Sequence, residues 1–203
     1  RYILYFMRNS NLLFFLIFLP IINSYAQTES NFNHFVMSEI GKINNDKIID
    51  SVAVTQDTID EKRPYRLEVY FGQNDKSYKL ALKTDKAILP DFPDGGNVSN
   101  GEVFWEIEII NRDLWIKHEL LRGHFQHQFQ YRDGKFKLME YNSVASDGRG
   151  KIFYQNLDFL TGIRRTQTDS YEQDKVLKKE EEFIKIEGKP DLSNFEPKSN
   201  RYF

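Results

Sequence analysis

Cysteine is absent from the 203-residue sequence. The chain therefore has no disulfide bonds, no cysteine-ligated metal and no lipid-modified cysteine. An exported chain of this kind must be stabilised by packing. The 17 phenylalanines and 11 tyrosines are the side chains best suited to that task, so an aromatic core is expected.

Long apolar runs are also missing. The one apolar stretch at the start of the chain covers residues 12–22 and contains Pro20. A membrane-spanning helix needs about 20 apolar residues, so this stretch is short for a span. We interpret it as the apolar core of a signal peptide, with a membrane anchor as the alternative.

The residues around this stretch fit that interpretation. Met7 is a plausible initiator, Arg8 supplies a basic flank, and Ser24-Tyr25-Ala26 has small residues at a cleavage position. We expect residues 1–26 to be removed as a signal peptide, with the mature chain beginning at Gln27. This predicts a periplasmic or secreted protein with no transmembrane segment in the mature chain.

Excess positive charge is a third absence. The chain has 28 basic and 30 acidic residues. Loss of Arg1 and Arg8 with the signal leaves 26 and 30, a net charge of −4. No basic stripe is present, so a nucleic-acid partner is not expected.

Residues 27–203 are predicted to form a single β-rich domain, with an irregular tail from about residue 188.

Catalytic motifs are missing as well. The sequence has no zinc-binding H-E-x-x-H motif, nucleophile elbow, phosphate loop or Ser-His-Asp spacing. We therefore predict a non-catalytic protein without a cofactor, apart from the calcium considered below.

What the sequence does contain is alternation of apolar and polar residues, most clearly over residues 103–141. This period of two is typical of half-buried antiparallel strands. The pattern predicts an all-β fold with little helix: a meander of hairpins arranged as a sandwich, a half-barrel or a partial propeller-like sheet. Residues 174–187 give mixed signals, because a charge block suitable for a helix precedes a strand-like apolar end.

The turns within the meander predict a register. Asp133-Gly134 suits a type I′ turn and would pair Tyr131 with Phe136. A second turn is predicted at Arg122-Gly123. These two turns would align four side chains in a row on the buried face of the sheet: Trp105, His118, His127 and Glu140.

Two interpretations of that row remain open. His118, His127 and Glu140 are the ligand types of a mononuclear iron site or an open zinc site, which would make the protein a metal-dependent enzyme. Alternatively, the row is a buried hydrogen-bond network in an aromatic core.

A polar loop at residues 41–50 precedes a strand at residues 51–55 and reads G-K-I-N-N-D-K-I-I-D. It resembles a degenerate FG-GAP or VCBS-type repeat loop, roughly G-D-x-N-x-D-G-x-x-D. The resemblance implies calcium on Asn44, Asp46 and Asp50. Lys42 stands in place of the first acidic ligand and Lys47 in place of the turn glycine. The alternative is a polar turn closed by side-chain hydrogen bonds to the backbone.

The resemblance extends to residues 129–132, 136–138 and 156–162, which are similar to segments of small exported bacterial proteins of unknown function. It lends no activity to the chain. We expect an exported binding or structural module of the bacterial envelope. A carbohydrate-binding module that uses Trp115, Tyr141 and Tyr154 is an alternative.

Overall fold

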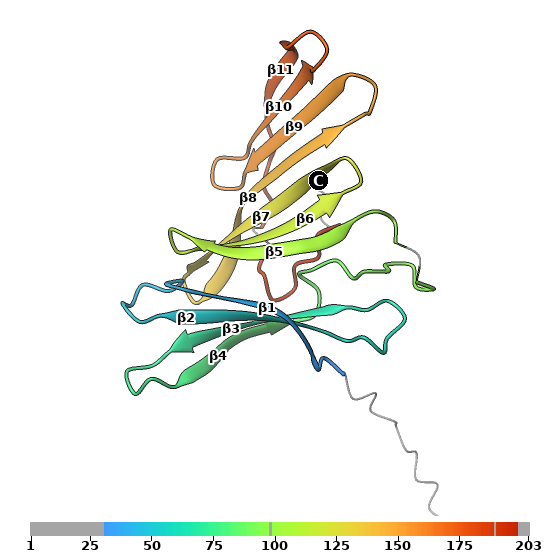
Figure 1. Cartoon of the computed structure of the whole chain (residues 1–203). Coiled ribbons are helices and arrows are strands. Elements are labelled where there is room, and N and C mark those ends of the chain that lie inside the picture. The colour runs from blue at the N-terminus through green and yellow to red at the C-terminus, as the bar shows by residue number, and fades with distance from the viewer. Residues whose placement is uncertain (1–30, 98, 189, 199–203) are drawn as a thin grey trace, which may run out of the picture.

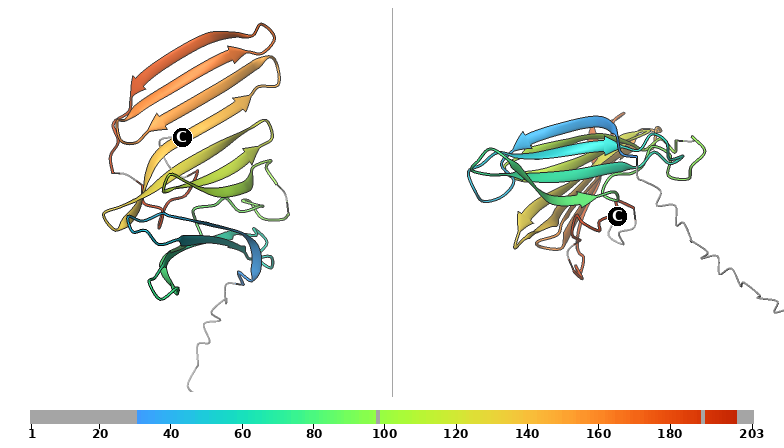
Figure 2. Two further views of the ribbon diagram at one scale, coloured as in Figure 1. Left: turned by 60° about the vertical axis from the view of Figure 1, so that its left-hand side comes forward. Right: turned by 90° about the horizontal axis from the view of Figure 1, so that it is seen from below.

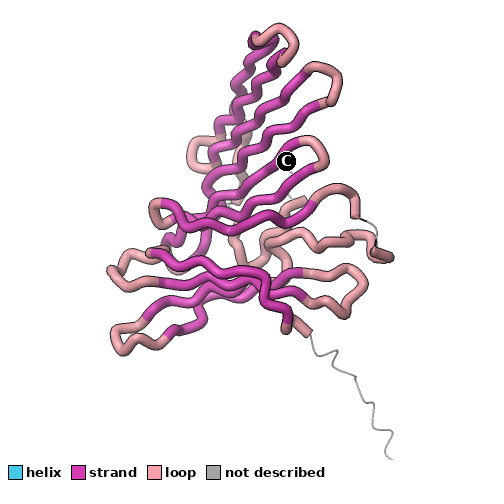
Figure 3. Tube along the Cα trace, viewed as in Figure 1, coloured by secondary structure: helices cyan, strands magenta, loops and turns pink. Residues whose placement is uncertain are grey.

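The computed structural model describes residues 31–97, 99–188 and 190–198, which form strands and loops without a helix (Figures 1 and 3). The expected signal peptide, residues 1–26, lies outside the described residues. The first sheet has the order β1-β2-β3-β4 and the second has the order β11-β10-β9-β8-β7-β6-β5. The first sheet consists of β1 (His34–Gly41), β2 (Asp50–Gln56), β3 (Tyr65–Gly72) and β4 (Tyr78–Thr84). The second consists of β5 (Val103–Ile110), β6 (Asp113–Leu120), β7 (Gly123–Arg132), β8 (Lys135–Ser146), β9 (Lys151–Asp158), β10 (Ile163–Ser170) and β11 (Lys175–Phe183).

Within each sheet, every strand pairs antiparallel with its neighbour in the sequence, which confirms the predicted all-β meander. Neither sheet closes on itself over the described residues. The turn at Asp133-Gly134 is also confirmed, since both residues have positive φ (53° and 77°) and Tyr131 pairs with Phe136. The ambiguous segment 174–187 contains an edge strand, β11.

The core lies between the four-stranded sheet and the β5–β8 part of the seven-stranded sheet (Figure 1). Alternate residues of β2 and β3 face alternate residues of β5 to β8, because each strand presents every second side chain to the interior. The fully buried apolar residues on these strands are Val52, Val54, Leu67, Val69, Ile107, Leu114, Ile116, Phe129 and Leu138. Full burial of each such side chain contributes about 1.5–3 kcal/mol.

The C-terminal tail completes this core. The backbone N–H of Leu192 donates to the Phe136 carbonyl (2.9 Å), which fixes the tail along the first residues of β8. Leu192 is fully buried and Phe195 is almost so, with its ring 5.0 Å from that of Phe129. The described part of the tail makes an isolated bridge between Asp191 and Lys137, and it is an integral part of the core.

The strands β9, β10 and β11 project beyond the four-stranded sheet (Figure 2, left). Among the described residues, no second sheet covers this projection, and all nine residues of β11 are exposed. Buried apolar side chains therefore contribute less to the stability of the projection than to the stability of the two-sheet core. Cross-strand pairing and ion pairs such as Arg165–Glu181 (2.9 Å) take a larger share there.

The predicted turn at Arg122-Gly123 is wrong. Leu120 pairs with Gly123, so the turn residues are Leu121 and Arg122 and the register shifts by two residues. Gly123 instead begins β7, where β8 passes very close: a Cβ at this position would lie 1.9 Å from the Val144 carbonyl oxygen. The glycine is therefore required by this close approach and also by its backbone conformation, since its φ is 147°.

Candidate functional site

The two histidines of the predicted row lie in the core on adjacent strands, His118 on β6 and His127 on β7, and both are fully buried. His118 stacks on Phe125 with ring centroids 4.7 Å apart and an interplanar angle of 9°. The His127 ring contacts Tyr141 (5.2 Å) and Phe195 (4.8 Å). We call His118 and His127 the histidine pair; they pack as members of an aromatic cluster.

Burial sets the charge of the histidine pair. It lowers the pKa of His118 to about 3, because the imidazolium form would lose its hydration. Burial, with the neighbouring His118, also holds the pKa of His127 well below its usual value. Both rings are therefore neutral near pH 7. The backbone N–H of Leu89 donates to Nε2 of His118 (3.2 Å), so this nitrogen is an acceptor that anchors the 85–92 loop.

Glu140 does not join the histidine pair, contrary to the sequence-based prediction. The β7–β8 register shifts at Met139, so that Glu140 pairs with Gln128 and Tyr141 pairs with His127. A residue inserted into one strand reverses the face of the residues that follow it. Glu140 consequently lies on the opposite, outer face, where it accepts hydrogen bonds from Asn142 and Asn156.

Trp105 is also absent from the row. A second bulge, between Phe104 and Glu106, places Phe104 opposite His118 and leaves Trp105 half exposed. Both interpretations of the row required Glu140 beside the histidines, and this geometry removes both. Nowhere in the described parts of the chain do three or more His, Asp or Glu side chains converge as a metal site would require.

The loop of the predicted calcium ligands is closed by its own hydrogen bonds. The carboxylate of Asp50 is fully buried and accepts from the backbone N–H groups of Ile43 (2.8 Å), Asn44 (3.2 Å) and Gly72 (3.1 Å). The Asn44 side-chain oxygen accepts from the N–H of Asp46 (2.8 Å). The side-chain oxygens of Asp50 and Asn44 therefore accept hydrogen bonds from backbone N–H groups. This arrangement is the polar turn that was the alternative to a calcium site.

This geometry predicts that calcium has little effect on stability. Addition of 10 mM calcium should shift the melting temperature by no more than about 1 °C, whereas a site with Kd near 1 mM would add about 1.4 kcal/mol, or roughly 3–5 °C. Thermal unfolding followed by circular dichroism measures this, with magnesium at the same concentration as the control. A rise of several degrees with calcium alone would show that Asn44, Asp46 and Asp50 do bind the ion.

One row of polar side chains crosses the outer face of the seven-stranded sheet from β6 to β10. Its cross-strand pairs join Lys117 to Gln126, Gln126 to Asn142, Asn142 to Asn156 and Asn156 to Arg165. At one end, Lys117 contacts two glutamates of β5, at 2.9 and 2.6 Å. The Lys117 pKa is raised; its partial burial opposes this shift, and the hydrogen bonds with the two glutamates outweigh that opposition.

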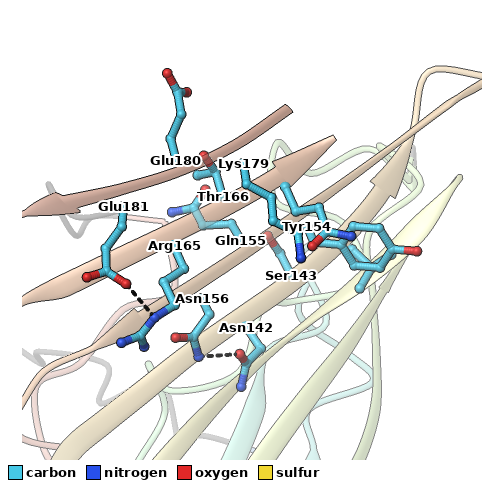
Figure 4. A pocket seen from close by; sticks show the side chains of 12 residues that line it. Asn142, Ser143, Tyr154, Gln155, Asn156, Arg165, Thr166, Lys179, Glu180 and Glu181 are labelled. Atoms are coloured by element: carbon cyan, nitrogen blue, oxygen red, sulfur yellow. Dashed lines mark hydrogen bonds and ion pairs between the residues drawn. The ribbon is translucent and has the colours of Figure 1, made fainter. Parts of the chain in front are cut away.

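On the projection, this face is hollowed into an open groove of about 510 Å³ across β8 to β11 (Figure 4). We call it the outer groove. Asn142, Asn156, Arg165 and Glu181 follow one another across the four strands in Figure 4. The Asn156 amide donates to Asn142 (2.8 Å) and Arg165 contacts Glu181 (2.9 Å). The remaining outer-face side chains that line it are Val144, Tyr154, Gln167 and Lys179.

The three aromatic residues considered for carbohydrate binding are not together. Tyr154 lines the outer groove and keeps 37% of its surface exposed. Trp115 lies on the same outer face but on β6, three strands away, and is partly buried. Tyr141 lies on the inner face against the histidine pair, and burial raises its pKa. The predicted flat row of three aromatic rings is therefore wrong, and Tyr154 is the one of the three that lines the groove.

The outer groove itself could not be predicted from the sequence. Its only sequence signal is the spacing of Asn142, Tyr154, Asn156 and Arg165 at alternate positions of three short strands. That spacing assigns them to one face only when the bulge at Met139 is known.

Fold and site together define a two-sheet, all-β protein with a groove, lined mainly by polar residues, on an uncovered part of one sheet. The chain matches no protein-family model, no curated protein and no solved structure. Within the described residues, the structure also has no helix of the length and apolarity that a membrane span requires.

Proposed function

We propose that the protein is a non-catalytic binding module of the bacterial envelope that holds a neutral, hydroxyl-rich ligand, an oligosaccharide, in the outer groove. The observation that carries this proposal is the groove lined by side-chain amides and one ring on the projecting strands. Its place in the envelope is proposed from the apolar stretch at residues 12–22 and from the resemblance to degenerate FG-GAP or VCBS-type repeats.

The chemistry of the groove supports a neutral ligand. Arg165 is neutralised by Glu181 (2.9 Å), and Glu180 lies on the other face in an ion pair with Lys178 (2.8 Å). Lys179 therefore adds a single positive charge to the outer-face lining, so a strongly charged polymer gains little net attraction there. Each side-chain amide has two donors and an acceptor oxygen. Asn142 and Asn156 use part of this capacity on each other and on Glu140. The rest suits hydroxyl groups, which both donate and accept.

Tyr154 supports a ligand with an apolar face. Its ring is partly exposed at the groove, and an aromatic ring with a polar tip pairs an apolar surface with a hydrogen-bonding group. A sugar ring has the matching arrangement, with C–H groups on its face and hydroxyls at its rim. The absence of a catalytic role is supported by the histidine pair, which is neutral and shielded from solvent.

The proposal is tested by titrating a panel of neutral hexasaccharides into the protein with isothermal calorimetry. We expect binding by at least one, and Tyr154→Ala should weaken it about tenfold, which corresponds to about 1.4 kcal/mol for the lost ring. Tyr171→Ala is the matched control, because Tyr171 is an exposed tyrosine on the β10–β11 turn outside the groove. No binding at millimolar sugar, or an equal effect of both substitutions, would contradict the proposal.

A further inference from the structure

The strand β11 forms the outer edge of the seven-stranded sheet, and its charges are arranged in two blocks. Its sequence is K-V-L-K-K-E-E-E-F, with lysines in the first half and glutamates in the second. An edge strand leaves a row of backbone N–H and C=O groups available for another strand. The charges of its side chains determine which strand can pair with this edge.

The direction of the backbone groups follows from the pairing with β10. The Ile184 N–H donates to the Gly162 carbonyl (2.7 Å), so position 184 directs its backbone groups toward the β10 side. These directions alternate along an antiparallel strand. Lys179, Glu181 and Phe183 therefore direct their N–H and C=O groups away from β10, toward the free edge. The bulge of β11 lies beyond this stretch, at Leu177, and leaves Lys178–Phe183 regular.

We propose that two copies of the protein form a two-fold dimer by antiparallel pairing of β11, in the register that places Lys179 opposite the partner's Glu181. In a dimer with a two-fold axis perpendicular to the sheet, each residue of β11 must pair with a residue of the partner's β11 whose side chain lies on the same face. The possible registers therefore differ from one another by two residues. In this register, Lys178 faces the partner's Glu182. Symmetry doubles each pair, giving four Lys–Glu pairs against one Glu180–Glu180 pair at the axis.

Neighbouring registers are worse. A shift of the partner strand by two residues in one direction places Lys179 opposite its own copy, and a shift by two residues in the other direction places Glu180 opposite Glu182. Opposite charges across strands stabilise pairing and like charges oppose it. The free edge of the other sheet, β4, lacks this complementarity: it carries Lys79 and Lys83 and no acidic residue. Of these two edges, β11 is the one whose charges specify a second copy.

The dimer would also join the two outer grooves. Lys179 and Glu181 both line the groove, and a perpendicular two-fold axis keeps the outer faces of both copies on one side of the joined sheet. The pairing itself involves β11 only and requires no ligand. It can therefore be tested independently of the proposed oligosaccharide binding.

The experiment is sedimentation velocity of the purified protein without sugar, over roughly 1–200 µM and at low and high salt. We expect a concentration-dependent dimer that weakens with salt. Lys179→Glu should weaken it by about tenfold or more, because two attractive pairs become repulsive. Lys76→Glu, the same charge change at the exposed β3–β4 turn, should leave the dimer unchanged.

A charge-exchange pair decides whether this register is used. Arg165→Glu combined with Glu181→Lys retains an ion pair between β10 and β11 in reverse, so the hairpin keeps its pairing, but it should also dissociate the dimer. When this double variant is mixed with the Lys179→Glu variant, the two should form a heterodimer. In it, the substituted position 179 of one copy and the substituted position 181 of the other carry opposite charges. A monomeric wild type at the highest concentration, or a mixture that stays monomeric, would overturn the proposal. Thermal unfolding confirms that each variant is folded.

Discussion

Lowering the pH from 7 to 4.5 should reduce the free energy of unfolding by about 5 kcal/mol, through the histidine pair. The usual histidine pKa of 6.5 applies to the unfolded chain, whereas burial holds both folded values far lower, at about 3 for His118. Below pH 6.5 the unfolded state therefore binds protons that the folded state does not. Stability is complete above pH 6.5 and is lost as the pH falls toward 3, by about 2.5 kcal/mol for each histidine between pH 7 and pH 4.5.

Urea unfolding at several pH values between 4.5 and 7 measures this loss. The titration of four carboxylates lies below this pH range, because their pKa values in the folded protein are lowered from 3.8. They are Asp57, Asp75, Asp133 and Asp147. Tyr141, which packs on His127, stays neutral throughout because burial raises its pKa.

Substitutions identify the source of the pH dependence. His127→Phe preserves an aromatic ring among Phe125, Tyr141 and Phe195, and it should remove about half of the loss. His124→Phe is the control: His124 is on the same strand but exposed, and its substitution should leave the dependence intact. Equal pH profiles for wild type and His127→Phe would show that the buried ring does not contribute.

Replacing Asp50 by alanine should cost about 3–5 kcal/mol of stability. Asp50 is fully buried and is the acceptor for three backbone N–H groups, two in the loop after β1 and one at Gly72 at the end of β3. Each donor left without a partner costs about 1–3 kcal/mol, and water entering the site offsets part of the sum. This carboxylate therefore ties three segments of the four-stranded sheet together.

Asp46→Ala is the matched control, since Asp46 lies in the same loop and is exposed. Its carboxylate accepts from the N–H of Ile48 (2.8 Å), so we expect a loss below about 1 kcal/mol. Equilibrium unfolding in urea gives both values. Similar losses for the two variants would refute the structural role assigned to Asp50.

The hairpins could be predicted from the sequence because alternation and turn chemistry agree there. Asp133-Gly134 fits a turn that needs two positive φ angles, and the pairs beside it are as expected. Gly123 shows where such reasoning fails. A glycine serves a tight turn or a close approach of another strand equally well, and the sequence near Gly123 does not show that β8 passes beside it.

The site was harder to predict because faces are decided by single residues. Placement of both histidines on the inner face was correct, since the β6–β7 register error was two residues and a shift of two preserves the face. Met139 is a one-residue bulge, so Glu140 was assigned to the wrong face. Bulges of this kind have no clear sequence pattern, because both faces of β8 here carry acceptable side chains.

The uncovered projection also has a consequence for how the molecule opens. The strands β10 and β11 are held by their neighbours in the sheet and by little apolar burial, whereas β9 contributes Leu157 to the core. Local unfolding of β10 and β11 therefore needs less free energy than global unfolding. Amide hydrogens should accordingly exchange fastest in β11 and progressively more slowly toward β8. The outer groove is thus built on the part of the protein that opens most readily, and it can open while the two-sheet core stays closed.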